Sequence, residues 1–134
     1  MRYLVTGHVK PGKSSKLLKA IENRTLGKGS IAGGEYVRNM KQARLLENTA
    51  VRWVEVCFCP TPLMEEIPYW EEYFNLTDIR DAHGRHNCRH ENGEKYWACS
   101  DCDCTLKLEK KMEYWGEKFL VKLKRNESVS TFNK

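Results

Sequence analysis

The fold depends most on one stretch, residues 51–58, which reads Val51-Arg52-Trp53-Val54-Glu55-Val56-Cys57-Phe58. It is rich in β-branched and aromatic residues, which favour a strand. Successive side chains of a strand point to opposite faces of its sheet. One face therefore carries Val54, Val56 and Phe58, and the other carries Trp53, Glu55 and Cys57. Pro60 and Pro62 follow and end the strand.

The neighbours of this strand predict a hairpin before it and a helix after it. Residues 35–46 are ambiguous between helix and strand, and we predict a strand because Glu47-Asn48-Thr49 makes a suitable hairpin turn. Residues 63–74 predict a helix that is acidic on one side and aromatic on the other, with Pro62 at its start. Residues 76–82 predict a last short strand.

The N-terminal part predicts one strand and one helix. Residues 2–9 alternate, so Leu4, Thr6 and His8 are expected on one face and the intervening apolar residues on the other. A Pro-Gly turn follows, and residues 14–21 have apolar residues at helical spacing. The order through residue 82 is β-α-β-β-α-β, a ferredoxin-like α+β body over residues 1–82. Such a sheet leaves one face open, which predicts a homodimer through that face.

A family resemblance accompanies this order. The run Gly7-His8-Val9-Lys10-Pro11-Gly12-Lys13, after a first strand and before a helix with paired leucines, resembles dimeric α+β barrel proteins, which include antibiotic-biosynthesis-monooxygenase-like domains. The resemblance covers residues 2–82 and concerns the fold. It implies two sheets packed face to face around a small cavity, and it carries over no catalytic residue. The cysteine-rich part of the chain departs from the family pattern.

That cysteine-rich part, residues 83–104, predicts a metal site. Thiolate and imidazole are the ligands that zinc and iron–sulfur clusters select, and a Cys-x-x-Cys pair suits one ion. The best set by spacing is Cys88, Cys99, Cys102 and Cys104. His90 is a substitute ligand, and Cys57 and Cys59 are further candidates that either join this site or build a second one. We expect zinc; an iron–sulfur cluster, disulfides (in a protein from a hyperthermophile) and redox thiols are the alternatives.

Residues 105–126 predict a C-terminal helix that packs on the body. Apolar residues recur there at helical intervals, although Gly116 weakens the middle, which predicts one kinked or two short helices. Residues 127–134 are polar and are expected to be a frayed tail.

A second candidate site follows from the expected strand pairing. If residues 2–9 and 51–58 are parallel neighbours, His8, Glu55 and Cys57 converge on the open face. A histidine, a carboxylate and a thiolate placed together can bind a metal or move a proton. The alternative interpretation is a set of polar contacts at a dimer interface.

Two patterns bear on phosphate. Residues 7–14 match the phosphate-binding loop Gly-x-x-x-x-Gly-Lys-Ser between a strand and a helix. That loop needs a parallel sheet, whereas residues 35–58 predict an antiparallel hairpin, so an ordinary turn is favoured. Lysines at 10, 13, 16 and 19 are better explained as a solvated helix face than as a nucleic-acid surface, because Trp53 is the only clear stacking candidate on the expected open face.

Composition and charge place the chain in a broad class. Its 134 residues fit one domain, and its 40% hydrophobic and 31% charged content allow a modest core. The charge is +5, with a basic front, an acidic stretch over residues 60–82 and a basic tail, which does not favour nucleic acid. No apolar run approaches the length of a membrane span, and no signal peptide is recognisable, so a cytoplasmic protein is expected.

The functional prediction is a small metal-binding protein that acts as a binding or scaffold module through its cysteine-rich site. An oxidoreductase-type enzyme with an open-face cavity, where a small molecule would bind, is the first alternative. A metal-handling or thiol redox protein is the second.

Overall fold

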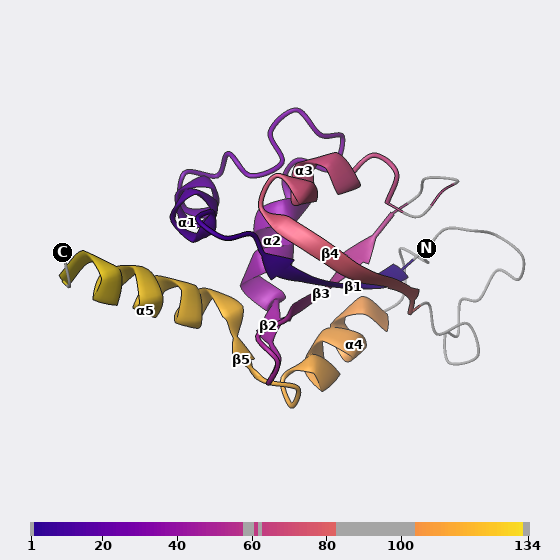
Figure 1. Cartoon of the computed structure of the whole chain (residues 1–134). Helices are drawn as coiled ribbons and strands as arrows, with labels where there is room; N and C mark the ends of the chain where they lie inside the picture. Colours follow the sequence, from indigo (N-terminus) through magenta and orange to yellow (C-terminus); the bar gives the residue numbers. More distant parts are fainter. Residues whose placement is uncertain (1, 58–60, 62, 83–103, 133–134) are drawn as a thin grey trace, which may run out of the picture.

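The computed structural model describes residues 2–57, 61, 63–82 and 104–132, which form an α+β fold on a five-stranded antiparallel sheet (Figure 1). The strands are β1 (Arg2–Val9), β2 (Arg44–Leu45), β3 (Val51–Val56), β4 (Phe74–Asp81) and β5 (Glu117–Lys118), in the sheet order β4-β1-β3-β2-β5. The helices are α1 (Ser14–Glu22), α2 (Glu35–Gln42), α3 (Ile67–Glu71), α4 (Cys104–Met112) and α5 (Phe119–Phe132).

β1 lies inside the sheet, between β3 and β4. Val5 lies opposite Trp53 of β3 and Ile79 of β4, and both pairings are antiparallel. Residues 2–9 and 51–56 are therefore neighbours, as predicted, but the parallel direction predicted for them is wrong. The reason is the β2–β3 hairpin. β3 reverses the direction of β2, and it therefore lies beside β1 in the antiparallel direction.

The core lies between one sheet face and the helices. Val5 and Trp53 from the strands are buried with Leu17 of α1, Met40 of α2 and Trp70 of α3. Aromatic rings fill much of this layer, because the centroid of the Trp53 ring lies 4.6 Å from that of Trp70. The face of β3 that carries Trp53, Glu55 and Cys57 is thus the helix-covered face, and the prediction that it is the open one is wrong.

The opposite sheet face is polar over much of its width. Arg52 Nε donates a 2.9 Å hydrogen bond to Thr6 Oγ1, and Arg80 pairs with Asp78 at 3.0 Å. α4 contacts β3, and buried Arg2, opposite Val56, extends its side chain toward α4. The face that the sequence predicts to be open for a homodimer therefore carries charged side chains and contacts α4.

The strand predicted over residues 35–46 is wrong, because most of it forms α2. Tyr36 and Met40, four residues apart, are buried on one side of the helix, while Glu35 and Lys41 are exposed on the other. Such spacing matches a helix, and the packing of these two side chains outweighs the β-propensity around Tyr36. The predicted strand shrinks to β2, which begins after Ala43 turns the backbone to extended geometry.

The helix predicted over residues 63–74 is shorter than expected. α3 spans Ile67–Glu71, after buried Leu63, whose φ of 55° is incompatible with a right-handed helix. β4 begins at Phe74, two residues before the predicted strand. Phe74 packs its ring 5.0 Å from Trp53, centroid to centroid, which places this part of the chain in the sheet.

The C-terminal part forms two helices separated by β5, so the single helix predicted as one possibility is wrong and the two-helix version is confirmed. Gly116 explains the break, since a Cβ there would lie 1.9 Å from Leu45 O. The glycine lets the chain pass against β2, where Lys118 pairs with Arg44. α5 continues to Phe132, so the frayed tail predicted from residue 127 is wrong for 127–132. Among the described residues, no helix has the length and apolar character to cross a bilayer.

Candidate functional site: a glutamate-lined cavity

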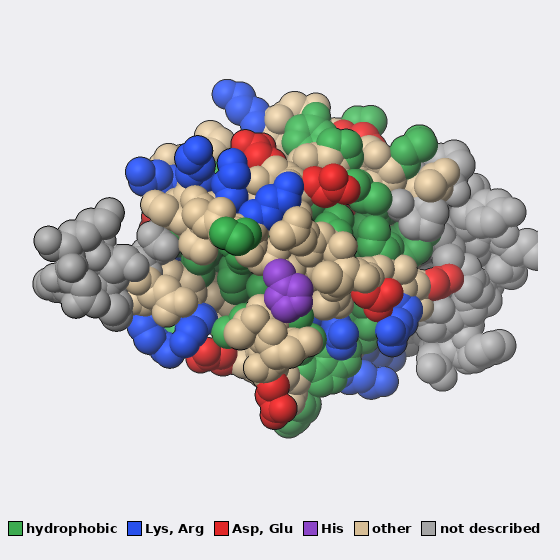
Figure 2. All heavy atoms as spheres, in the orientation of Figure 1, with side chains coloured by type: hydrophobic (Ala, Val, Ile, Leu, Met, Phe, Trp, Pro, Cys, Tyr) green, Lys and Arg blue, Asp and Glu red, His purple; other side chains and the backbone are tan. Residues whose placement is uncertain are grey.

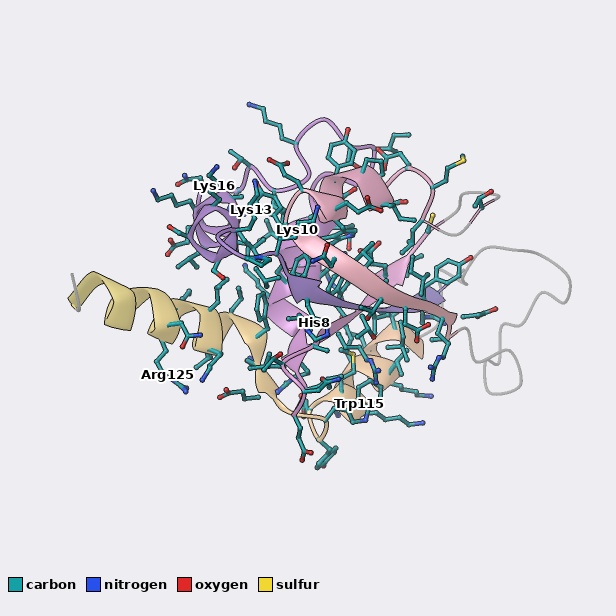
Figure 3. The ribbon with its side chains drawn as sticks, in the orientation of Figure 1. His8, Lys10, Lys13, Lys16, Trp115 and Arg125 are labelled. Atoms are coloured by element: carbon teal, nitrogen blue, oxygen red, sulfur yellow. The ribbon has the colours of Figure 1, made fainter. Side chains whose placement is uncertain are left out.

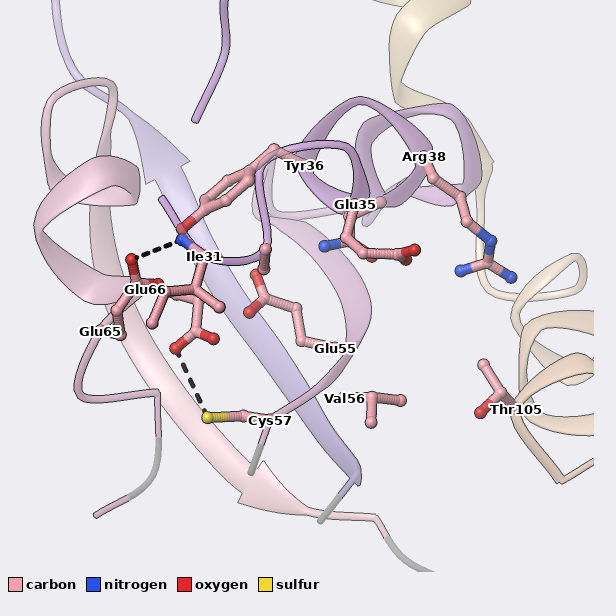
Figure 4. Close-up of a pocket in the computed structure, with 12 residues that line it drawn as sticks. Ile31, Glu35, Tyr36, Arg38, Glu55, Val56, Cys57, Glu65, Glu66 and Thr105 are labelled. Atoms are coloured by element: carbon pink, nitrogen blue, oxygen red, sulfur yellow. Dashed lines mark hydrogen bonds between the residues drawn. The ribbon is translucent and has the colours of Figure 1, made fainter. Parts of the chain in front are cut away.

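A cavity of about 710 Å³ opens beside the C-terminal end of β3 (Figure 4). It lies between that strand, α2 and the chain just before α3. Its wall consists of Ile31, Ala32, Glu35, Tyr36, Arg38, Asn39, Glu55, Val56, Cys57, Glu65, Glu66 and Thr105. Most of this wall is apolar, yet four glutamates contribute to it. The cavity therefore combines a mainly apolar lining with several carboxyl groups.

Glu55 is the buried carboxyl group of the cavity. Its side chain comes from the helix-covered face of β3 and is only 3% exposed. Trp53 Nε1 donates a 2.7 Å hydrogen bond to Glu55 Oε1. The pKa of Glu55 is raised to about 8, mainly by burial and also by the negative charge of Glu66, while the hydrogen bond from Trp53 opposes the rise. At neutral pH this carboxyl group is largely protonated.

A second indole group lies close to the same carboxyl. Trp70 Nε1 is buried and has no hydrogen-bond partner within the part of the chain that the structure describes, and it helps to lower the pKa of Glu55. The indole groups of Trp53 and Trp70, which belong to the aromatic core, therefore both influence the pKa of Glu55.

Cys57 and Glu66 form the next polar contact of the wall. The Cys57 thiol donates to Glu66 Oε2 at 3.4 Å, and both residues are buried (Figure 4). Glu66 comes from the turn before α3, whereas Cys57 directly follows β3. The contact thus brings a carboxylate from the acidic stretch over residues 60–82 against the sheet.

Hydrogen bonds hold the rim of the cavity in place. Glu65 accepts from Ser30 Oγ at 2.7 Å and from the Ile31 N–H at 3.0 Å. Tyr36 donates its hydroxyl to Ser30 Oγ at 2.9 Å, and burial raises the pKa of Tyr36 above its usual range. The loop before α2 is therefore tied both to the turn before α3 and to α2 itself.

The opposite rim is held by α4. Arg38 Nη2 of α2 lies 2.7 Å from Glu109 Oε1 of α4, and the Glu109 side chain is only 6% exposed. Arg38 supplies the positive charge of the cavity wall, and this ion pair already engages it.

The predicted site of His8, Glu55 and Cys57 is wrong as a single site. Glu55 and Cys57 do line one cavity, but His8 lies near the other end of β1, where it borders a separate cavity of about 240 Å³. Glu55 pairs with Tyr3, and five residues along a strand correspond to roughly 16 Å. The predicted convergence rested on parallel pairing, which the sheet does not have.

The predicted metal ligands fall mostly outside the described residues. Cys59, Cys88, His90, Cys99 and Cys102 belong to the parts that the structure leaves undescribed, and Cys104 is described only as the first residue of α4. Of the predicted set, Cys57 has a described side chain, and it faces Glu66. Among the described residues, no group of three or more His, Cys, Asp or Glu side chains is arranged to hold a metal ion.

The phosphate-binding loop match has an ordinary structural explanation. β1 is antiparallel to both neighbours, whereas the loop belongs to parallel sheets. The Lys13 N–H donates to Lys10 O at 3.1 Å and closes a turn. Gly7 lies where a Cβ would come within 3.0 Å of Asn75 O, at a register shift of the sheet.

The lysines around α1 form an exposed basic patch. Figure 2 shows Lys and Arg side chains gathered at the upper left, and Figure 3 places Lys13 and Lys16 there, with Lys10 nearer the centre, between them and His8. Trp53, the expected stacking residue, is fully buried beneath the helices. Trp53 therefore cannot stack on a nucleic-acid base beside this patch.

Sequence reasoning missed the residues that surround Glu55 and Cys57. Tyr36 and Arg38 were assigned to a strand, so they were not expected to face β3 from a helix. Glu65 and Glu66 belong to the helix that the sequence predicts over residues 63–74, on its acidic side. The available signal was the spacing of Tyr36 and Met40, which matches a buried helix side.

Comparison of the chain with models of protein families, with curated proteins and with solved structures found no match.

Proposed function

We propose that this chain is a small metal-binding α+β protein, in which the cysteine-rich residues 83–104 hold a zinc ion and tie α4 to the sheet. Cys88, Cys99, Cys102 and Cys104 supply four thiolates, the number that closes a structural zinc site. The protein then acts as a binding or scaffold module that depends on its metal for full stability.

One structural observation carries this proposal. The residues on both sides of 83–103 are bonded to the same arginine: the Ala82 N–H donates to Arg2 O at 2.8 Å, and Arg2 Nε donates to Thr105 Oγ1 at 2.8 Å. Bringing the ends of a long segment together has an entropic cost. A metal bound to thiolates within that segment of the folded protein would offset this cost with its binding free energy.

The position of Cys57 supports leaving it out of the ligand set. Its sulfur points into the glutamate-lined cavity and donates to Glu66, with 1% of the residue exposed. We therefore propose the four later cysteines as ligands, with His90 as a substitute, and treat Cys57 as a residue of the cavity.

The ferredoxin-like fold and the homodimer are also proposals. The order β4-β1-β3-β2, with the core helices packed on one face, supports a ferredoxin-like body for the first 82 residues. A homodimer remains a prediction, and the second sheet face gives it little support because Arg52, Asp78 and Arg80 occupy it. A sedimentation measurement decides between monomer and dimer. The proposal also assumes reduced thiols, as in cytoplasm.

The test is elemental analysis of freshly purified protein together with a visible spectrum and a thiol count. We expect about one zinc per chain and no visible colour. The double variant Cys99→Ser/Cys102→Ser should lose the metal, whereas the matched variant Cys57→Ser should retain it. If the protein contains iron and absorbs visible light, the site holds an iron–sulfur cluster and not zinc. Oxidised cysteines without metal would refute the proposal. Rapid transfer to a weak chelator would favour a metal-handling role instead.

A further inference from the structure

We propose that the glutamate-lined cavity binds a compact organic cation, with an ammonium or amidinium group seated between Glu55 and Glu66 and an apolar body against Tyr36 and Val56. This inference is independent of the proposed metal site, because its residues are described side chains and none of them is a proposed zinc ligand.

The size and lining of the cavity suit a small molecule. Its volume of about 710 Å³ lies inside the range of about 300–1,000 Å³ that is usual for ligand pockets. Such pockets are mainly apolar with a few placed polar groups. Ile31, Ala32, Tyr36 and Val56 supply apolar surface here, and the rim bonds made by Glu65 hold the wall without a ligand.

The charges of the wall select the sign of the ligand. Among the described residues that line the cavity, four are glutamates, and the arginine, Arg38, is paired with Glu109. An anionic ligand would be repelled by Glu35, Glu65 and Glu66 in a partly desolvated space. A cation would be attracted by the same groups, and its apolar body would pack against the remaining wall.

Glu55 differs from the more exposed carboxyl groups of the cavity because it is buried. The side chain is buried and faces the cavity from the sheet (Figure 4). Trp53 engages Oε1, and Trp70 also favours the ionised form of this carboxyl. An ionised carboxylate at this depth is unfavourable unless a cation compensates it. A bound ammonium supplies that compensation, so binding should ionise Glu55.

Binding is therefore coupled to a proton. Below pH 8 the free protein holds a proton on Glu55, and the cation displaces it to solvent. The affinity should rise with pH until Glu55 is already ionised. The other titratable and charged groups that face this carboxyl from the surrounding elements are Cys57, Glu66, Glu65, Tyr36, Glu35 and Arg38.

The experiment compares matched probes on the full chain by isothermal titration calorimetry. The cations are 2-phenylethylammonium and benzamidinium, their neutral counterparts are 2-phenylethanol and benzamide, and phenylacetate is the anion. We expect at least one cation to bind, at least tenfold tighter than its neutral counterpart, with no binding of phenylacetate. At pH 6.5, titrations in buffers of different ionisation enthalpy should show close to one proton released per cation.

Variants locate the binding. Glu55→Gln should weaken the cation at least tenfold and abolish the proton release, whereas Glu22→Gln, at an exposed carboxylate of α1 that does not line the cavity, should change affinity less than threefold. Glu66→Gln provides a second test if Glu55→Gln does not fold, as judged by circular dichroism. The proposal is overturned if no cation binds, if neutral and charged probes bind equally, or if both buried-site variants bind as the wild type does.

Discussion

Trp53 Nε1 donates a 2.7 Å hydrogen bond to Glu55 Oε1, and the two side chains leave β3 on the same face of the sheet. The bond holds a carboxyl group at the boundary between the aromatic core and the cavity. Since burial outweighs the bond, the pKa of Glu55 is raised to about 8 rather than lowered. The stability of the fold and the chemistry of the cavity therefore depend on the same proton.

The first prediction concerns pH. Between pH 4.5, the unperturbed pKa of Glu55, and pH 8 the folded state binds a proton that the unfolded state has lost, so the free energy of unfolding falls as pH rises. The slope from this group is at most about 1.4 kcal/mol per pH unit. Glu55→Gln, which stays neutral and keeps an acceptor oxygen for Trp53, should remove that contribution. Urea unfolding at several pH values measures it.

The control for this prediction is Glu35→Gln, which removes an exposed carboxylate of the same cavity. It should leave the pH dependence close to that of the wild type. Identical slopes for wild type and Glu55→Gln would show that Glu55 is ionised in the folded protein.

The second prediction concerns the link between β1 and α4. Thr105→Val keeps the shape of the side chain but removes the acceptor of Arg2 Nε, and Arg2 is 1% exposed. Losing a bond to a buried charged group should lower the free energy of unfolding by about 1–3 kcal/mol. Thr105→Ser keeps the hydroxyl and should lose much less. A larger loss in Thr105→Ser than in Thr105→Val would mean that the methyl group, and not the hydrogen bond, matters.

The third prediction concerns the ion pair between α2 and α4. Arg38→Met leaves the Glu109 carboxylate buried without this partner, and Glu109 Oε2 already lacks a hydrogen-bond partner among the described residues. Because the Arg38 side chain is 39% exposed, solvent screening reduces the effect to about 1–2 kcal/mol. A double-mutant cycle with Glu109→Gln measures the coupling. A coupling energy near zero would contradict the pair.

The fourth prediction concerns Gly116. In Gly116→Ala the new Cβ would lie 1.9 Å from Leu45 O, a backbone atom of β2. The strands must shift, so the free energy of unfolding should fall by about 2 kcal/mol or more. The matched variant is Gly34→Ala, where a Cβ meets nothing within 4 Å and the backbone is helical. It should be neutral or stabilising by up to about 1 kcal/mol.

Sequence reasoning recovered the elements whose pattern is local. β1 and β3 alternate clearly, and α1 carries Leu17 and Ile21 at helical spacing, so these three elements were predicted close to their bounds. α2 was missed because Tyr36 and Val37 have strand propensity, and only packing against β3 and α3 makes the segment helical. Local propensity gives way to tertiary contacts in such cases.

The candidate site was recovered only in part, for a related reason. Glu55 and Cys57 were identified from their alternation on one strand, and they do share a cavity. His8 was expected beside them because residues 2–9 and 51–58 were predicted to be parallel, whereas the two strands are antiparallel. Glu66 joins the site through a turn whose position follows from Leu63 and α3, which no periodic pattern in the sequence indicates.

We propose that a metal ion closes the cysteine-rich segment, whereas Cys57 belongs to the cavity. The most direct measurement is native mass spectrometry of the wild type and of the two serine variants, Cys99→Ser/Cys102→Ser and Cys57→Ser, under reducing conditions. We expect one zinc on the wild type and on Cys57→Ser, and none on the double variant. A metal-free wild type, or loss of the metal from Cys57→Ser alone, would contradict it.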